Sequence, residues 1–427
     1  MSRVGIGICG LGTVGAGAFN LLRQNADEIN RKVGTLLEIA QVGCRRDHPD
    51  CDLSSVAVTR DIFDVVTNPD VDIVLELIGG IDVALELVKQ AIANGKHIVT
   101  ANKALIAEHG EEIFRLAAGA GVSVRYEAAI AGGIPIVKAI REGLVANRIE
   151  FVAGIINGTS NYILTEMEAS GNRGFDQVLA EAQALGYAEA DPTFDVEGID
   201  AAHKLTILSS IAFGVPLRFG AVYTEGISRV TPDDIRYAGE LGYRIKHLGI
   251  TRKREGGIEL RVHPTLIDKD SMLAQVDGVM NAVLVSADAA GRTMYYGAGA
   301  GAGPTASSVV GDIIDIVRDS SGIANLGFKS EAIETLPVFD IRQIRSCFYL
   351  KLRVLDKPGV LARISTILSQ HNISIESLIQ KDVRTGHAPI VIITDDVLEE
   401  ELNKALDELQ SLPEVEGEVT RIRVESL

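Results

Sequence analysis

The sequence predicts an α/β protein with three successive units: an N-terminal parallel sheet covered by helices, an α+β middle region and a small ferredoxin-like C-terminal unit. Three observations support this prediction. A glycine-rich segment, GLGTVG, follows the first apolar run; short β-rich runs alternate with helical runs up to about residue 130; and a β-α-β-β-α-β pattern occupies about the last 80 residues. A chain of 427 residues is too long for one hydrophobic core, so two or three domains are expected.

Composition and charge exclude several classes of protein. The formal net charge is -17, and no cluster of lysine and arginine stands out, which argues against nucleic acid or an anionic membrane as a partner. The apolar runs are too short for a bilayer span, and the N-terminus lacks the pattern of a signal peptide. The four cysteines show no CxxC spacing and are expected as free thiols. We therefore expect a cytoplasmic protein without nucleic-acid or membrane partners.

Residues 1–134 form the first predicted domain. Its strands are expected at 4–9, 37–44, 72–79, 96–100 and 122–128, and its helices at 14–31, 81–94 and 108–120. This alternation is typical of a parallel sheet with helices on its faces. A run rich in small residues ends in a helix at about 304–325, which we expect to return and complete this domain.

The middle and C-terminal regions follow different patterns. Residues 135–303 mix helices at 134–144, 175–186 and 199–213 with strands at 148–156, 256–267 and 281–288. Residues 326–346 lack clear periodicity and are the predicted linker. Residues 347–427 are predicted as a ferredoxin-like domain, with strands at 348–356, 373–382, 387–394 and 417–426 and helices at 359–372 and 398–412.

The segment GLGTVG lies where the first strand meets the first helix and fits the pattern G-x-G-x-x-G. In a Rossmann-type domain Gly10 would allow the tight turn, Gly12 would let a pyrophosphate approach the backbone, and Gly15 would allow close packing of helix on strand. The pattern alone is weak, because an ordinary tight turn in a glycine-rich chain can match it. Its position after the first strand favours a dinucleotide site at the start of the helix.

Basic residues end two of the predicted strands. Arg45 and Arg46 follow the second strand, where an acid would bind the ribose of NAD and an arginine would accommodate the 2′-phosphate of NADP. They favour NADP, although two solvated loop arginines would give the same pattern. Asn102 and Lys103 follow a later strand, at the sheet edge where ligands of open α/β sheets bind. A ligand-binding or catalytic role is favoured over a solvated lysine.

Residues 186–205, GYAEADPTFDVEGIDAAHKL, concentrate acids just before an apolar run. Asp200 and Lys204 are four residues apart and share one helix face. If exposed, such a pair would contribute only about 0.3–0.5 kcal/mol. The following LTILSSIAF is apolar on nearly every side, which indicates a buried helix whose charges must be paired or functional. A lysine held by a carboxylate suits proton transfer during carbonyl reduction, whereas His203 is expected to be structural. No spacing here favours a catalytic divalent metal.

With these residues identified, the sequence resembles the homoserine dehydrogenase family over essentially its whole length. The matching segments are GLGTVG, NKAL, YEAAIAGGIPI, GIINGTSNYIL, LGYAEADPTFDVEGIDAAHKL and GAGAGPTAS. The resemblance implies NAD(P)H-dependent interconversion of L-aspartate 4-semialdehyde and L-homoserine, on the route to threonine and methionine. It also implies that the middle region binds the substrate and mediates dimerisation.

The resemblance implies roles for individual residues. Lys204 matches the proton donor, with Asp200 beside it, and Lys103 matches a lysine near the nicotinamide and the reacting oxygen. Glu189 matches a carboxylate that binds the substrate, through its ammonium group, in a pocket shaped by Asp195, Tyr187, Gly158 and Thr159. Cofactor contacts match Leu11, Thr13, Val14, Arg45, Lys103 and Gly303. A structural monovalent cation, usually sodium, would bind loop oxygens at Glu127, Ile130, Gly132 and Ile134. Where some members have two adjacent acids, this chain has Phe194 and then Asp195.

The segment LDKPGVLARI, residues 355–364, resembles the ACT domain. In that family the loop after the first strand helps to form an amino-acid effector site, generally between paired domains. Pro358 and Gly359 agree with this, because a tight bend there leaves helix-start amides free for a carboxylate. Feedback inhibition by L-threonine is therefore expected.

The prediction as a whole is an NADPH-preferring homoserine dehydrogenase, with NAD also possible, that assembles as a homodimer or homotetramer. Two alternatives stay open. Another ACT-bearing dehydrogenase, acting on a 2-hydroxy acid, would be expected to use a catalytic histidine. An amino-acid-sensing protein on an inactive scaffold would be expected to have lost part of the lysine and acid set, yet Lys103, Glu189, Asp200 and Lys204 are all present.

Overall fold

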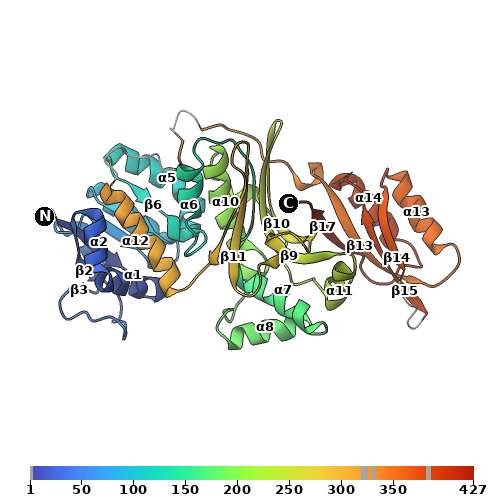
Figure 1. Cartoon of the computed structure of the whole chain (residues 1–427), viewed down its shortest axis with the longest axis horizontal. Helices are drawn as coiled ribbons and strands as arrows, with labels where there is room; N and C mark the ends of the chain where they lie inside the picture. The colour runs from blue at the N-terminus through green and yellow to red at the C-terminus, as the bar shows by residue number, and fades with distance from the viewer. Residues whose placement is uncertain (1–2, 319–325, 329–332, 381–385) are drawn as a thin grey trace.

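The computed structural model describes residues 3–318, 326–328, 333–380 and 386–427. The chain is elongated, with a helix-covered sheet at one end, a long mixed sheet in the middle and a smaller α/β unit at the other end (Figure 1). The predicted α/β class is therefore confirmed. Within the described residues, no helix is both long enough and apolar enough to cross a bilayer.

The N-terminal sheet has six parallel strands in the order β3-β2-β1-β4-β5-β6. They are β1 Arg3–Cys9, β2 Leu36–Gly43, β3 Ala57–Thr59, β4 Ile73–Glu76, β5 His97–Thr100 and β6 Val124–Arg125. The strand order reverses between β1 and β4. In open α/β sheets, ligands bind at that point, outside the carboxyl ends of the strands.

The helices of this unit are α1 Thr13–Gln24, α2 Ala26–Val33, α3 Ile62–Thr67, α4 Asp82–Ala93 and α5 Lys103–Ala120. The single helix predicted at 14–31 is wrong, because the backbone of Asn25 leaves the helical conformation and separates α1 from α2. The strand predicted at 122–128 is short, since the chain turns into the 3₁₀-helix η1 Glu127–Ala129.

A helix from far along the chain also packs on this sheet. In Figure 1, α12 Ala302–Arg318 lies beside α1 although about 300 residues separate them. A Cβ on Gly17 of α1 would lie 2.4 Å from the carbonyl oxygen of Ala302, so the two backbones pack very closely. Residues 319–325, which the sequence places at the end of the returning helix, lie outside the described residues.

The middle region contributes six strands to an 11-stranded sheet. They are β7 Ile149–Ile155, β8 Tyr223–Thr224, β9 Tyr243–Arg254, β10 Gly257–Asp268, β11 Met280–Ala287 and β12 Gly291–Ala298. β9 and β12 were not predicted. The basic residues of β9 interrupt its apolar pattern, and β12 runs into the small-residue segment before α12. β9 forms a hairpin with β10 around Gly256, whose φ of 84° suits a tight turn.

The C-terminal unit has the predicted β-α-β-β-α-β order. It contains β13 Arg345–Leu355, α13 Val360–Gln370, β14 Ile375–Gln380, β15 His387–Thr394, the short β16 Val397–Leu398, α14 Glu399–Gln410 and β17 Thr420–Glu425. Its sheet is not separate from the middle sheet, because β17 pairs with β13 on one side and with β10 on the other. Of the strand predicted at 373–382 and the linker predicted at 326–346, residues 381–382 and 329–332 lie outside the described residues.

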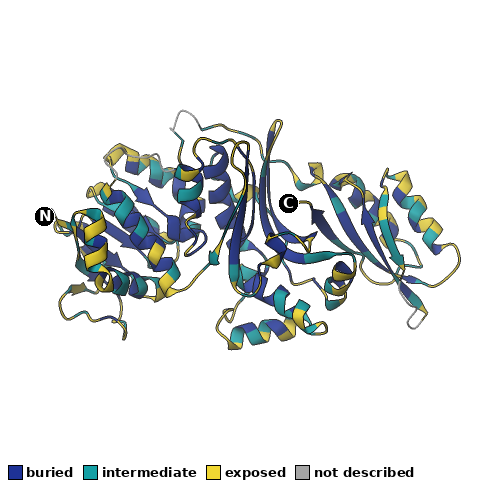
Figure 2. Ribbon diagram, viewed as in Figure 1, coloured by how far each residue is buried: buried dark blue, intermediate teal, exposed yellow. Residues whose placement is uncertain are grey.

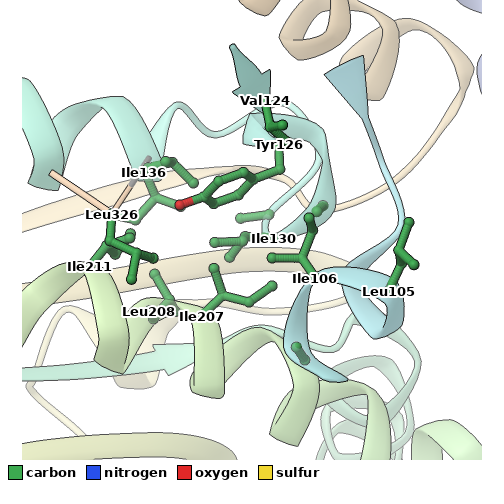
Figure 3. Close-up of a cluster of buried hydrophobic side chains, with 14 of the residues drawn as sticks. Leu105, Ile106, Val124, Tyr126, Ile130, Ile136, Ile207, Leu208, Ile211 and Leu326 are labelled. Atoms are coloured by element: carbon green, nitrogen blue, oxygen red, sulfur yellow. The ribbon is translucent and has the colours of Figure 1, made fainter. Parts of the chain in front are cut away.

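The remaining helices are α6 Ile136–Lys138, α7 Gly158–Ser170, α8 Phe175–Ala184, α9 Thr193–Val196, α10 Ile199–Phe213 and α11 Pro232–Glu240, and α6 continues as the π-helical turn Ala139–Gly143. Helix α10 lies between the two sheets and is almost completely buried (Figure 2). Its residues Ile207, Leu208 and Ile211 pack towards Ile106 of α5 and Tyr126 (Figure 3). This packing fixes the N-terminal turn of α10, which carries the predicted functional pair.

Candidate functional site

The glycine turn after β1 opens one part of a cleft. Gly10 has φ of 97°, and a Cβ there would lie 2.5 Å from the carbonyl oxygen of Leu77. A Cβ on Gly15 would lie 2.1 Å from the carbonyl oxygen of Gly10, so neither glycine can be replaced without moving backbone. A Cβ on Gly12 would meet nothing within 4 Å. Gly12 therefore keeps the space in front of the first amides of α1 open, as pyrophosphate binding requires.

A cleft of about 1140 Å³ runs from this turn to the ends of β2 and β3. Arg45 and Arg46 line it and are exposed. Arg60 lines the same cleft, 2.8 Å from Asp47 and 3.2 Å from the carbonyl oxygen of Cys44. The sequence analysis missed Arg60, although a basic residue directly after a strand was the signal used for Arg45.

Other residues predicted to contact the cofactor surround the start of α1. Leu11 is buried, Thr13 is exposed as the first residue of α1, and Val14 lines the part of the cleft that continues towards β4 and β5. Gly303 lies at the exposed start of α12, where a Cβ would meet nothing within 4 Å.

The second part of the cleft, about 470 Å³, lies at the ends of β4 and β5. Lys103 and Phe194 line it, and Leu77 and Gly79 line both parts. A dinucleotide bound across the point of strand reversal would therefore have one half on each side of β1.

A buried acid organises this second part. Glu76, at the end of β4, accepts a hydrogen bond from the Thr100 hydroxyl at 2.5 Å, and burial raises its pKa. Thr100 in turn accepts the backbone amide of Asn102 at 3.0 Å, and Asn102 caps α5 by accepting the amide of Leu105 at 3.1 Å. Glu76 thus fixes the turn that presents Lys103. The acid inside the apolar run DIVLELIG was the signal that the sequence analysis left unused.

The carboxylate of Asp200 joins two lysines. Its Oδ2 accepts Lys204 Nζ at 2.7 Å, and its Oδ1 lies 3.1 Å from Lys103 Nζ. Lys204 Nζ also donates to the carbonyl oxygen of Ile156 at 2.7 Å. Asp200 and Lys204 are buried, whereas the Lys103 side chain is 32% exposed. Three segments therefore meet at one point: the start of α5 with Lys103, the N-terminal part of α10 with Asp200 and Lys204, and Ile156 directly after β7.

Burial and charge act in opposite directions at this centre. Burial alone would raise the pKa of Asp200, but the charges of Lys204 and Lys103 outweigh it and hold the pKa at about 2. Burial lowers the pKa of Lys204, and the charge of Asp200 partly offsets that effect. Asp200 is thus a carboxylate at neutral pH, and Lys204 gives up its proton more readily than an exposed lysine.

Asn157 connects this centre to a second group of polar residues. Its side-chain amide donates to Asp200 Oδ2 at 2.9 Å and to Asp195 Oδ1 at 2.7 Å, and its carbonyl caps α7. The hydroxyl of Thr159 lies 3.1 Å from Asp195 Oδ2 and 2.7 Å from the carbonyl oxygen of Tyr187. A Cβ on Gly158 would lie 2.7 Å from the carbonyl oxygen of Val279, so this turn packs tightly. The sequence analysis missed the role of Asn157.

Glu189 lies at the edge of this group. The Tyr187 ring beside it packs on Tyr162 with centroids 5.0 Å apart. The carboxylate of Glu189 is exposed, and it makes no hydrogen bond or ion pair to the Asp200 centre in the part of the chain that the structure describes. The structure therefore brings Lys103, Asp195, Thr159 and the pair on α10 together, but among the described residues it does not connect the Glu189 carboxylate to them.

The positions predicted to hold a cation share the turn between η1 and α6. The Glu127 carboxylate accepts the amides of Val137 and Lys138, each at 2.8 Å, and burial raises its pKa to about 7. The carbonyl oxygen of Gly132 accepts the Ser308 hydroxyl at 2.6 Å. Backbone carbonyl oxygens such as those of Ile130, Gly132 and Ile134 are of the ligand type that hard cations take, and each has a second lone pair beyond the hydrogen bonds that Gly132 and Ile134 already accept.

Family models match three successive parts of the chain. They are described as the NAD-binding domain of homoserine dehydrogenase over residues 10–127, homoserine dehydrogenase over residues 135–314 and the ACT domain over residues 348–414.

Individual relatives match over their whole length. A homoserine dehydrogenase of Pseudomonas aeruginosa is 58% identical, with 100% of each chain covered. A homoserine dehydrogenase crystal structure from Thiobacillus denitrificans is 53% identical, with a TM-score of 0.95 over 100% of this chain and 99% of that one. A hyperthermophilic archaeal homoserine dehydrogenase in complex with NADPH is 26% identical, with a TM-score of 0.62 over 77% of this chain and 99% of that one.

Proposed function

This chain belongs to the homoserine dehydrogenase family, and we propose that it interconverts L-aspartate 4-semialdehyde and L-homoserine. In this proposal the enzyme prefers NADPH, and Lys204 is the proton donor. The observation that carries the proposal is the buried Asp200–Lys204 pair. Asp200 lies 3.1 Å from Lys103, which lines the second part of the cleft, and it accepts a hydrogen bond from Asn157, which also binds Asp195. The bound cofactor supplies the hydride.

The residues of the chain supply the proton and the orientation. Lys204 donates a proton to the carbonyl oxygen of the semialdehyde and, in the reverse direction, takes it from the hydroxyl of homoserine. Asp200 holds the ammonium of Lys204 in place and keeps Lys103 turned towards the same oxygen. Burial lowers the pKa of Lys204, so it gives up a proton more readily than an exposed lysine does, which suits proton transfer in this reaction.

The second group of polar residues forms the proposed pocket for the amino-acid end of the substrate. The exposed carboxylate of Glu189 attracts the substrate ammonium group. Asp195, Thr159, Gly158 and Tyr187 shape the pocket, and their mutual hydrogen bonds keep it rigid before substrate binds. The side chain of Asn157 bridges Asp195 and Asp200. This one residue therefore positions both a side chain of the substrate pocket and the partner of Lys204.

The cofactor preference follows from charge. Leu11 and Val14 line the cleft, and Thr13 and Gly303 lie at the starts of α1 and α12; in this proposal they contact the pyrophosphate and nicotinamide halves. Arg45, Arg46 and Arg60 line the end of the cleft that would receive a 2′-phosphate. The solved archaeal relative in complex with NADPH supports this choice.

Replacing Arg45 with alanine should raise the KM for NADPH about tenfold or more and leave the KM for NADH nearly unchanged, because one charge-assisted contact to phosphate contributes about 1.5–3 kcal/mol. Steady-state rates with both cofactors measure the effect. Arg31→Ala, an exposed arginine paired with Glu28 on α2, is the matched control. Equal losses with NADPH and NADH would contradict the proposed role.

A monovalent cation, sodium in the simplest case, is placed at the carbonyl oxygens of Ile130, Gly132 and Ile134 beside Glu127. Its role is structural, since that turn connects the N-terminal sheet to α6 and α12.

The proposed units are the dinucleotide-binding domain 1–134 with 304–325, the substrate domain 135–303, the linker 326–346 and the regulatory domain 347–427. Homodimers or homotetramers are the proposed assembly, because ACT effector sites generally lie between paired domains.

Regulation by L-threonine is proposed through the C-terminal unit. Gly359, with φ of 87°, starts α13 without a side-chain cap. The amide of Val360 donates to the carbonyl oxygen of Lys357 at 3.3 Å, and the next amides of this turn are the ones proposed to bind a carboxylate. Arg423 of β17 binds Glu399 of α14 at 2.9 Å and Glu225 of the middle region at 2.8 Å. Two residues after Glu225, the amide of Ile227 donates to the carbonyl of Val196, next to Asp195. An effector that shifts α14 or β17 can therefore change the substrate pocket.

L-Threonine is expected to inhibit the wild-type enzyme, and Glu225→Gln should raise the half-inhibitory concentration about fivefold or more, as typical coupling energies allow. Basal turnover of homoserine should change by less than about twofold, because Glu225 lines neither part of the cofactor cleft and binds Arg423 instead. Titration of initial rates with threonine measures both. Unchanged inhibition in the variant would contradict this route, and an unaffected wild type would contradict threonine as effector.

A further inference from the structure

The second part of the cofactor cleft has one aromatic wall. Phe194 of α9 faces the ends of β4 and β5, and among the described residues that line this part it alone comes from outside the N-terminal sheet and its helices. Its side chain is large and apolar, yet the residue is 40% exposed. An exposed aromatic ring at the mouth of a cleft is available to a planar ligand.

The back of the Phe194 ring is held by a stack of rings. The imidazole of His203 lies 5.5 Å from Phe194 and 4.0 Å from Phe219, with interplanar angles of 24° and 10°. His203 Nε2 lies 3.1 Å from Glu108 Oε1 of α5. Burial lowers the pKa of His203, so the stack is uncharged at neutral pH. The ring of Phe194 is therefore fixed from behind by α10 and α5.

Lys103 lies near the centre of the Phe194 ring. Its Nζ lies 5.6 Å from the centroid of Phe194 and 3.1 Å from Asp200 Oδ1. A cation over an aromatic face is attracted by the negative face of the ring. The ammonium of Lys103 is thus placed by two groups that come from α9 and α10, although Lys103 itself belongs to α5.

We propose that Phe194 is a positioning residue that forms the wall for the nicotinamide ring and, with Asp200, fixes Lys103 Nζ beside the reacting oxygen. The inference rests on the proposed NADPH-dependent reaction. The wall excludes water from the side of the cleft that faces the substrate unit, and the ring limits the movement of Lys103. A displacement of Lys103 by an ångström would reduce the rate without abolishing binding.

Four variants separate the two roles. Phe194→Ala should weaken NADPH binding about tenfold, because the apolar wall is lost, and lower kcat about tenfold, because Lys103 is misplaced; each tenfold change corresponds to about 1.4 kcal/mol. Phe194→Leu keeps the apolar wall but not the ring face, so it should recover NADPH affinity but not kcat. Phe194→Tyr should recover both. Met272→Ala, which removes a side chain of a residue that is 64% exposed and lies outside the cleft, is the control.

NADPH dissociation constants come from the fluorescence of the bound cofactor, and kcat from homoserine oxidation. The proposal is overturned if Phe194→Ala stays within about twofold of wild type in both, or if Phe194→Leu matches wild type in kcat. The binding measurement does not depend on turnover. A wild type that binds NADPH but does not oxidise homoserine would refute the proposed reaction, while the dissociation constants would still decide whether Phe194 forms the wall.

Discussion

Lys204→Ala is expected to reduce homoserine oxidation about 10³-fold while the dissociation constant of NADPH stays within about twofold, because the variant loses the proton-transfer group and no cofactor contact. Lys204 is buried on α10 and donates to Asp200 and to the carbonyl oxygen of Ile156. Initial rates and cofactor fluorescence together measure the two effects.

A matched control is available elsewhere in the chain. Lys246 is also buried and paired, with Asp277 at 3.0 Å and the carbonyl of Val276 at 2.7 Å, but it lies on β9 away from both clefts. Lys246→Ala should lower stability in a similar way and leave kcat nearly unchanged. Turnover of Lys204→Ala within about tenfold of wild type would contradict the assignment of the proton donor.

Asp200→Asn is expected to have the second largest effect of these substitutions, a shift in the pH dependence of homoserine oxidation. Homoserine oxidation needs Lys204 in its neutral form, so the rate rises with pH through the pKa of Lys204. In the wild type burial lowers that pKa and the charge of Asp200 partly restores it. Removing the negative charge lowers the pKa of Lys204 further. The acidic limb of kcat/KM is therefore expected to move to lower pH, while the maximum falls because Lys204 and Lys103 lose their common partner.

The same substitution should reduce stability. It leaves two ammonium groups beside a neutral amide, and breaking a buried pair in this way costs about 3–5 kcal/mol. The pKa of Asp200 is about 2, below its ordinary value of 3.8, so its contribution of about 2 kcal/mol is fully present above pH 4 and is lost as the pH falls towards 2. The free energy of unfolding of Asp200→Asn should therefore not show this loss as the pH falls from about 4 towards 2.

Urea unfolding at several pH values and a pH–rate profile measure both consequences. Asp234→Asn is the control, because Asp234 is equally buried and paired with Lys351 at 2.7 Å but lies at the start of α11. It should reduce stability without moving the pH profile. An Asp200→Asn profile that moves to higher pH, or does not move, would show that Asp200 does not set the pKa of Lys204.

Local sequence patterns were enough to predict the parts of the site that depend on neighbouring residues. Gly10, Gly12 and Gly15 lie close together in the sequence, in one strand-to-helix turn, so their spacing alone predicts that turn. Asp200 and Lys204 meet because they are four residues apart on a buried helix. The apolar run after Lys204 indicated that burial correctly.

The features that were missed depend on residues far apart in the chain. Asn157 acts by bridging two carboxylates that follow it by 38 and 43 residues. Glu76 acts through Thr100, 24 residues away, and β17 continues the middle sheet by pairing with β10, some 160 residues earlier. A one-dimensional pattern contains propensity and spacing but not these partners. The position of Glu189 is a different case, because its partner is expected to be a ligand rather than the chain.

The most direct test of the whole account is the oxidation of L-homoserine by the purified wild-type protein with NADP, compared with a 2-hydroxy acid under the same conditions. Reduction of the cofactor is followed by its absorbance. Saturable reduction with L-homoserine is expected, with a rate at least about 10³-fold lower for the 2-hydroxy acid, because Glu189 would be left without the ammonium group that it is proposed to bind. No reduction with L-homoserine, or a faster rate with the 2-hydroxy acid, would contradict the account.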